Sequence, residues 1–196
     1  VENGSVFAEE DEALDQAFAR FDGLIAAAGP LLYLSLTWAD ENRFGGGNRC
    51  SVGLKDDGRR LLDYLCEKLI AVDLSHTCDQ LAVDILNHID RHQLPLKVLA
   101  SHSLLRARHD VPRNIPDEIA AEIIRRGGLI GLNVIVPFIG ADSTEIFVEH
   151  MQHLLGLGGA TAIALGTDFF LDAENRTAPL FLSACSDASQ HAERNS

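Results

Sequence analysis

The chain has 196 residues, of which 46% are hydrophobic, and this is enough for one domain with a sizeable core. It contains 16 basic and 29 acidic residues, giving a formal net charge of −13, which argues against a nucleic-acid partner. No apolar run approaches the roughly 20 residues that span a bilayer, so we expect no membrane-spanning segment.

The cysteine pattern and the N-terminus bear on the compartment and on the extent of the protein. The four cysteines have neither CxxC pairing nor zinc-finger spacing, so we expect no disulfide scaffold, no thiolate metal site and a reducing, cytoplasmic location. Val1 is not an initiator methionine, and no signal-peptide pattern follows it. We therefore expect the chain to be an internal part of a longer protein.

Amphipathic helices and short apolar strands alternate along the chain. In each expected helix apolar residues recur every three or four positions, as Leu14, Phe18, Phe21, Leu24 and Ile25 do in the first one. The expected elements are a strand stub at Val1, a helix over 11–28, a strand over 31–37, a helix marked by Leu61, Leu65 and Leu69, a strand over 71–74, a helix over 79–88, a strand over 97–100, a helix beginning at Pro116, a strand over 129–134, a helix over 144–155 and a strand over 161–165.

The spacing of these strands indicates the fold class. Successive strands begin roughly 30 residues apart, which is typical of βα units with parallel strands. The strands are apolar on both faces, as parallel strands covered by helices are. Either a doubly wound sheet or a (β/α)8 barrel fits, and the chain holds about six of the eight units of such a barrel.

Four of the expected strands end on a residue that can bind a metal ion. These residues are Glu2, His76, His102 and Asp168. In parallel α/β proteins the reactive side chains gather just beyond the carboxyl ends of the strands. Two imidazoles and two carboxylates at one such place form a nitrogen and oxygen ligand set suited to Zn²⁺ or Mn²⁺.

The remaining histidines do not follow strands. His88, His92, His150 and His153 fall within or just after amphipathic helices, and His191 lies in the polar C-terminal stretch. We expect solvated or capping roles for them.

Several short motifs carry a resemblance to a known family. They are Val1–Ser5, Leu32–Thr37, Asp73–His76, Ser101–Ser103, Arg113–Asp117, Gly131–Asn133 and Gly166–Phe169. In this order they resemble the membrane (renal) dipeptidase family of zinc peptidases, peptidase M19, in its bacterial form. The combination of His-Ser with Arg-Asn-x-Pro-Asp is the specific part of the match, which runs over nearly all of the chain up to about Phe170.

The resemblance implies a (β/α)8 TIM-barrel hydrolase with two divalent metal ions, expected to be Zn²⁺. Residues 1–182 would be a partial catalytic barrel holding strands three to eight, and residues 183–196 a polar C-terminal tail. Hydrolysis of dipeptides through a metal-activated water is the expected activity. The expected partner is a small dipeptide-like substrate, and the assignment leaves room for a homodimer.

The resemblance also implies a role for individual residues. Glu2 matches the glutamate that bridges the two ions, and His76 and His102 match the imidazoles that complete the second ion's ligand shell. Asp168 matches the aspartate that handles the proton of the metal-bound water. Arg113 matches the arginine that binds the free carboxylate of the substrate. We expect Phe138 to line the substrate site as well.

The sequence departs from the family pattern at several places. The His-x-Asp of the first strand is absent, and we expect it upstream of Val1. Trp38 stands where the family has a substrate-contacting histidine, and an indole cannot stabilise an oxyanion as an imidazolium does. Phe170 stands where a second acid is common. Residues 40–47 also differ, and we expect them to form a mobile lid or a plain connection.

Two other functions fit the same residues. One is a hydrolase of the same fold whose pocket, altered by Trp38, accepts another small amide, an ester or a lactone. The other is a barrel without catalytic activity that serves as a binding protein. Arg113 favours substrates with a free carboxylate, whereas Trp38 favours these alternatives.

Overall fold

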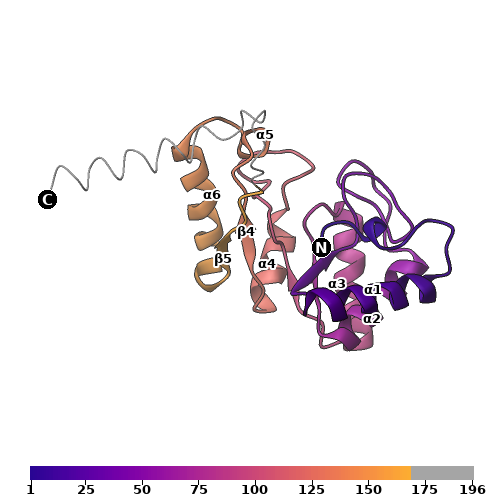
Figure 1. Ribbon diagram of the computed structural model, residues 1–196. Coiled ribbons are helices and arrows are strands. Elements are labelled where there is room, and N and C mark those ends of the chain that lie inside the picture. The colour runs from indigo at the N-terminus through magenta and orange to yellow at the C-terminus, as the bar shows by residue number, and fades with distance from the viewer. Residues whose placement is uncertain (169–196) are drawn as a thin grey trace, which may run out of the picture.

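The computed structural model of the chain describes residues 1–168 (Figure 1). The predicted tail over 183–196, the end of the predicted barrel region up to 182, and Phe170 lie outside the described residues. The elements in chain order are η1 (Gly4–Val6), α1 (Leu14–Ala28), β1 (Tyr33–Ser35), α2 (Asp56–Lys68), β2 (Ala71–Asp73), α3 (Asp79–His92), β3 (Val98–Leu99), α4 (Asp117–Arg125), β4 (Ile130–Leu132), α5 (Val136–Ile139), α6 (Thr144–Gly156), η2 (Gly159–Thr161) and β5 (Ile163–Leu165).

The strands are parallel and lie side by side in chain order. β1 pairs with β2, β2 with β3, and β4 with β5. A parallel bridge between Ala100 and Ile130 joins the two groups. Val1 extends the sheet on the other side of β1, because its carbonyl accepts a hydrogen bond from the Ser35 amide at 3.1 Å.

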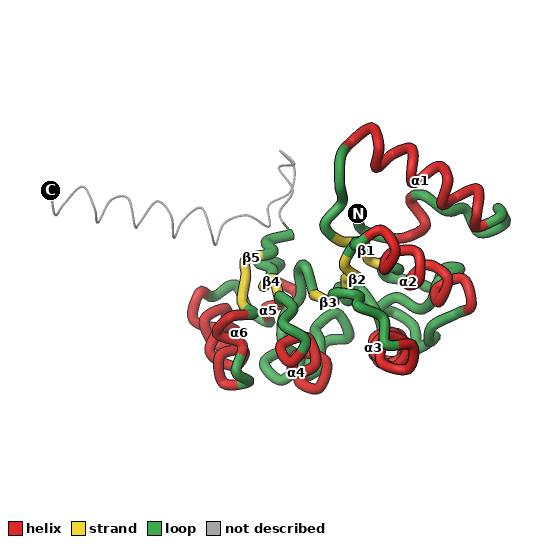
Figure 2. The backbone as a smooth tube through the Cα atoms, turned by 90° about the horizontal axis from the view of Figure 1, so that it is seen from below, coloured by secondary structure: helices red, strands yellow, loops and turns green. Residues whose placement is uncertain are grey.

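This order decides between the two folds that the strand spacing allowed. A doubly wound sheet reverses its strand order at a switch point, whereas the strands of a barrel follow one another in sequence. The described strands follow one another without a reversal. The chain therefore forms an arc of a (β/α)8 TIM barrel, and Figure 2 shows α3, α4 and α6 along one side of this arc.

The hydrophobic core lies between the strands and these helices. Alternate strand residues point to the same face of a sheet, and Leu34, Val72 and Val98 occupy equivalent register positions. All three are buried, as are the inward residues of the helices that pack on them. Those helix residues include Leu61, Leu65, Leu81, Ile85, Ile119 and Ile123.

Several predicted boundaries and core positions were wrong. Leu69 lies beyond the end of α2, has a φ of 58° and is 87% exposed, because the chain turns there through a left-handed cap. Leu24 lies in α1 but is 49% exposed. α5 was not predicted, since four residues with a proline in the first turn give no helical periodicity.

The segment over 40–47, which was expected to form a lid or a connection, is a packed connection. Asn42 is buried, and its Nδ2 donates to the Leu36 carbonyl at 2.8 Å while its Oδ1 accepts from the Phe44 amide at 2.8 Å. Phe44 is fully buried. A Cβ atom at Gly47 would lie 2.1 Å from the Trp38 carbonyl oxygen, so only glycine fits there.

Among the helices of residues 1–168, none combines the length and the apolarity that a bilayer crossing requires.

His150 corrects the expectation that the helix histidines are solvated or cap helices. Its side chain in α6 is fully buried. Nδ1 accepts a hydrogen bond from the Leu105 amide at 3.2 Å, and Nε2 lies 3.1 Å from the Ile139 carbonyl. The neutral ring with its proton on Nε2 satisfies both groups. His150 therefore ties α6 to the loop after β3 and to the end of α5.

This arrangement predicts a pH-dependent contribution of His150 to stability. Burial lowers the pKa of His150 from its usual value of 6.5, so the unfolded chain binds the proton more readily than the folded one. The contribution is full above about pH 6.5 and decreases as the pH falls below it. We expect His150→Gln to lower the free energy of unfolding by about 1–3 kcal/mol at pH 8. The difference in this free energy between the wild type and the variant is expected to be smaller at pH 5.5. Denaturant titrations at both pH values measure this, and an equal gap at both would contradict the prediction.

Candidate metal centre

Glu2, His76 and His102 converge at the carboxyl ends of neighbouring strands. One ligand atom from each lies within 4.8 Å of the other two. Nε2 of His76 is 2.8 Å from Oε1 of Glu2 and 3.0 Å from Nε2 of His102. His76 and His102 are 8% and 9% exposed. The structure thus brings together three of the four residues that the strand ends predicted as metal ligands.

The local backbone explains how these side chains reach a common point. Glu2 follows Val1 at the edge of the sheet, His76 follows β2 and His102 follows β3. Three residues at these strand ends adopt the left-handed conformation, with φ of 69° at Asn3, 70° at His76 and 56° at Asp168. Strained backbone of this kind gathers at functional sites, where the surrounding structure enforces it.

The electrostatics of the three residues are coupled. The neighbouring His102 and His76 side chains hold the pKa of Glu2 well below its usual range, so its carboxylate is charged. Burial lowers the pKa of His76, which favours the neutral ring. A charged carboxylate with neutral imidazoles is the protonation state in which these groups bind a divalent cation.

Asp168, the fourth predicted residue, does not join this cluster. It is half-buried, and its ligand atoms lie outside the group formed by Glu2, His76 and His102. Its negative charge acts on Arg113. Of the three acidic residues that raise the pKa of this arginine, Asp168 has the largest effect. Asp168 is therefore close enough for its charge to act on Arg113, but its carboxylate is not part of the cluster.

Arg113 is buried beside the histidines, with only 4% of its surface exposed. One Nη atom donates to the His102 carbonyl at 2.7 Å and lies 3.2 Å from Nε2 of His76, and the other donates to Ser103 at 3.3 Å. Its Nε has no hydrogen-bond partner, and no carboxylate of residues 1–168 forms an ion pair with it. Little solvent reaches the guanidinium to compensate its charge, and this burial lowers the pKa of Arg113.

Phe138 and Trp38, the other two predicted substrate-binding residues, lie beside two different members of this group. The Phe138 ring centroid lies 5.4 Å from the guanidinium carbon of Arg113. Trp38 is 52% exposed, and its ring centroid lies 6.3 Å from that of His76. The guanidinium carbon of Arg49 lies 5.9 Å from the Trp38 ring centroid. The Phe138 ring therefore lies against the arginine, and the Trp38 ring lies beside one histidine of the cluster.

Asp73, Ser101 and Ser75 form a hydrogen-bonded layer beneath the cluster that sequence reasoning missed. Asp73 is buried, and its Oδ2 accepts a hydrogen bond from the Ser101 hydroxyl at 2.5 Å. The Ser101 hydroxyl also lies 2.6 Å from Nδ1 of His102. An acidic residue at the end of an apolar strand was the available signal, but only the parallel register shows that it faces Ser101.

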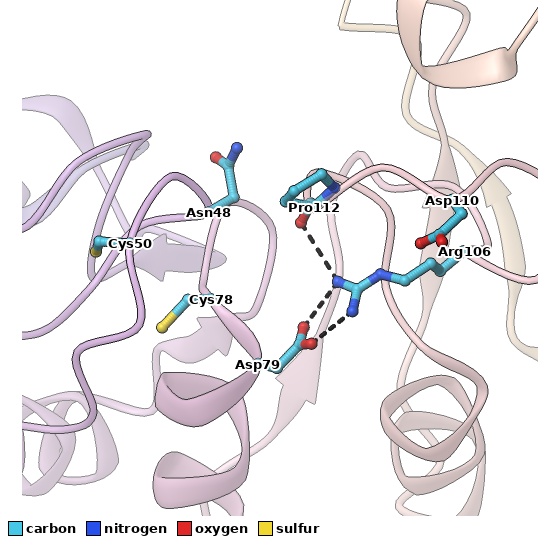
Figure 3. A pocket seen from close by; sticks show the side chains of 7 residues that line it. All are labelled: Asn48, Cys50, Cys78, Asp79, Arg106, Asp110 and Pro112. Carbon is cyan, nitrogen blue, oxygen red and sulfur yellow. Dashed lines mark hydrogen bonds and ion pairs between the residues drawn. The ribbon is translucent and has the colours of Figure 1, made fainter.

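A separate pocket of about 190 Å³ lies outside the cluster (Figure 3). It is lined by Asn48, Cys50, Cys78, Asp79, Arg106, Asp110 and Pro112. Arg106 donates to Asp79 through both Nη atoms, at 2.5 and 2.7 Å, and closes one wall. None of the predicted site residues lines this pocket. Within residues 1–168, Cys50, Cys66 and Cys78 form no disulfide bond, and Cys185 lies outside the described residues.

Comparison with known proteins gives a family match over most of the chain. The model of the family described as membrane dipeptidase, peptidase family M19, matches residues 9–183. An uncharacterized dipeptidase of Schizosaccharomyces pombe is 30% identical over 128 residues, which cover 63% of this chain and 30% of that protein.

Two solved structures have the same fold. One, described as dipeptidase AC, a metallo peptidase of family M19, has a TM-score of 0.68 and 26% identity, over 87% of this chain and 54% of its own. The other is a metallo peptidase from Rhodobacter sphaeroides bound to a phosphinate mimic of the dipeptide L-Ala-D-Ala. Its TM-score is 0.69 and its identity 24%, over 88% of this chain and 52% of its own. The chain therefore spans about half of these structures and less of the yeast relative.

Proposed function

The chain belongs to the membrane dipeptidase family, peptidase family M19, and from this premise we propose that it carries the metal-binding and substrate-binding face of a hydrolase that cleaves dipeptides. The observation that carries the proposal is the convergence of Glu2, His76 and His102 beside a buried arginine without a carboxylate partner among residues 1–168. One group is suited to a cation and the other to an anion, and they lie within hydrogen-bond distance of each other.

The ligand set fits a divalent metal ion. One carboxylate and two imidazoles supply oxygen and nitrogen atoms, which Zn²⁺ binds well, and three protein ligands leave a position open. We propose that these residues hold Zn²⁺ and that the second oxygen of Glu2 is available to a second ion. When bound, such ions polarise the amide carbonyl and acidify water at the site.

Arg113 supplies the recognition of the substrate. A buried guanidinium is costly unless an anion compensates its charge, and a carboxylate matches its planar pair of donors. A dipeptide presents such a carboxylate at its C-terminus. We propose that this group binds Arg113 next to the Phe138 ring, so that the peptide bond lies over the metal-binding cluster.

Asp168 supplies the proton transfer. Its carboxylate is half-buried and lies outside the cluster of Glu2, His76 and His102, which leaves it available to accept a proton from water and to donate it to the leaving nitrogen. The residues thus divide the work, since Glu2 and the histidines bind the metal, Arg113 binds the substrate carboxylate, and Asp168 moves the proton.

The role of Arg113 gives the test of this proposal. Arg113→Lys keeps the charge but loses the two-donor fork, so we expect KM for free dipeptides to rise by about 10- to 100-fold. Dipeptides amidated at the C-terminus lack the carboxylate, and their kcat/KM is expected to change little. Steady-state kinetics of the full-length protein on matched free-acid and amidated substrates measure this ratio. Equal losses on both would rule out carboxylate recognition by Arg113.

Trp38 favours a second candidate, a hydrolase of the same fold acting on another small amide, an ester or a lactone. The indole is half-exposed next to His76, where it offers apolar surface to a substrate rather than a proton. Assays of the full-length protein on dipeptides, acylated amino acids and lactones separate the two candidates. If the protein with metal bound turned over none of these substrates, a role as a binding protein would be favoured.

The expectations of a homodimer and of a cytoplasmic location stay predictions.

A further inference from the structure

The layer beneath the cluster connects a buried carboxylate to one of its histidines. Oδ1 of Asp73 accepts hydrogen bonds from the amides of Ser75 at 2.9 Å and Ser101 at 2.8 Å. Oδ2 accepts from the Ser101 hydroxyl at 2.5 Å, and that hydroxyl oxygen is 2.6 Å from Nδ1 of His102. Asp73 is 1% exposed, so solvent does not compete for these bonds.

The protons in this chain of bonds can be placed by counting. Serine has one hydroxyl proton, and the charged carboxylate of Asp73 can only accept, so Ser101 donates its proton to Asp73. The Ser101 oxygen must then accept from His102, which places the imidazole proton on Nδ1. Nε2 of His102 is left with its lone pair, and it is this atom that faces Glu2 and His76.

We propose that Asp73 is a positioning residue that acts through Ser101 to hold His102 in the tautomer whose Nε2 binds the metal ion. The proposal rests on the metal-binding role of His102 proposed above. His76 offers a contrast within the same cluster, because its Nδ1 is buried and has no hydrogen-bond partner among the described residues. Only one of the two histidines is therefore fixed in this way, and partners of this kind orient metal-binding imidazoles and raise their basicity.

The substitution Asp73→Asn reverses the direction of the bonds. The asparagine oxygen must take the place of Oδ1, because two backbone amides donate to that position. Its amide nitrogen then faces Ser101 and donates to the hydroxyl, which turns its own proton toward Nδ1 of His102. The imidazole proton moves to Nε2, where it blocks the metal ion.

Two measurements on the full-length protein test this proposal. In metal-free protein with ¹⁵N-labelled histidine, long-range proton–nitrogen NMR spectra report the tautomer of each ring, and His102→Ala identifies the signal. We expect the proton on Nδ1 in the wild type and on Nε2 in Asp73→Asn. Zn²⁺ titration against a competing chelator is expected to show a 10- to 100-fold loss of affinity in the variant.

Two further variants keep the test decisive. Ser101→Ala removes the hydroxyl but leaves Asp73 with its two backbone amides, so the His102 signal is expected to become a mixture of tautomers even if Asp73→Asn fails to fold. Asp84→Asn is the matched control, because Asp84 also accepts from a backbone amide and a side chain but lies on α3 outside the cluster.

The outcomes separate this proposal from the proposed function. The positioning role of Asp73 would be overturned if the His102 proton stayed on Nδ1 in both Asp73→Asn and Ser101→Ala. It would also be overturned if Asp84→Asn lost as much Zn²⁺ affinity as Asp73→Asn. If the wild-type protein bound no Zn²⁺, the metal-binding role of His102 would be refuted, and the tautomer would then have no metal ion to serve. The NMR spectra would then still report whether Asp73 sets the tautomer.

Discussion

Full-length protein carrying His76→Ala or His102→Ala is expected to lose tight binding of one metal ion. Each substitution removes one of the three described ligands, so two protein groups remain where a zinc site with an open position has three. We expect the affinity for Zn²⁺ to fall by more than about 100-fold, which exceeds the effect of removing a supporting partner. Elemental analysis after gel filtration measures the metal content of each variant.

His92→Ala is the matched control for these variants. His92 is an exposed histidine at the end of α3, so its removal deletes an imidazole without touching the cluster. The wild type and this control are expected to gain thermal stability on addition of Zn²⁺, because a ligand that binds the folded state raises the melting temperature. The two cluster variants are expected to lose most of that gain. Equal metal content in all four proteins would show that His76 and His102 are structural.

Much of the fold could be predicted because its signals are local. The alternation of amphipathic helices with apolar strands and the regular spacing of the strands predicted parallel βα units, and the structure has them in that order. The choice of a barrel could not come from spacing, since a doubly wound sheet has the same period. Leu69 shows the limit at element ends, where a left-handed cap exposes a residue that continues the helical pattern.

The location of the candidate site could be predicted from the sequence, but the contacts between its side chains could not. Because the carboxyl ends of parallel strands meet at one edge, Glu2, His76 and His102 could be expected to converge, and they do. The position of Asp168 outside the cluster of Glu2, His76 and His102 depends on the loop conformation after β5. The burial of His150 depends on α5, a helix too short to leave a periodic pattern.

The same limit applies to the pair of Asp73 and Ser101. Both residues stand in motifs that carry the family resemblance, and yet neither motif says that one side chain faces the other. The parallel register pairs Asp73 with Leu99, which places Ser101 two residues further along the neighbouring strand and on the same face. Contacts across strands of this kind become visible only when the register is known.

Asp168→Asn is expected to lower kcat by at least about 100-fold while the metal content stays at the wild-type level. The amide has nearly the shape of the carboxyl group but cannot accept the proton of water or return it to a leaving nitrogen. Asn also tolerates the left-handed backbone that Asp168 adopts, with its φ of 56°, so the substitution adds little strain. The effect is therefore expected in the chemical step and not in folding.

The size of this loss, and whether it appears in kcat or in KM, distinguish a role of Asp168 in proton transfer from a purely electrostatic role. Asp168 also raises the pKa of Arg113, so its neutralisation removes a nearby negative charge as well as a base. If electrostatics were its only role, KM for free dipeptides would change and kcat would stay within a few-fold of the wild type. Asp110→Asn controls for charge, because it neutralises an exposed acid in the loop before Arg113. A wild-type kcat in Asp168→Asn, measured on a dipeptide that the wild type cleaves, would remove Asp168 from the chemical step and leave the transfer of the proton to another group.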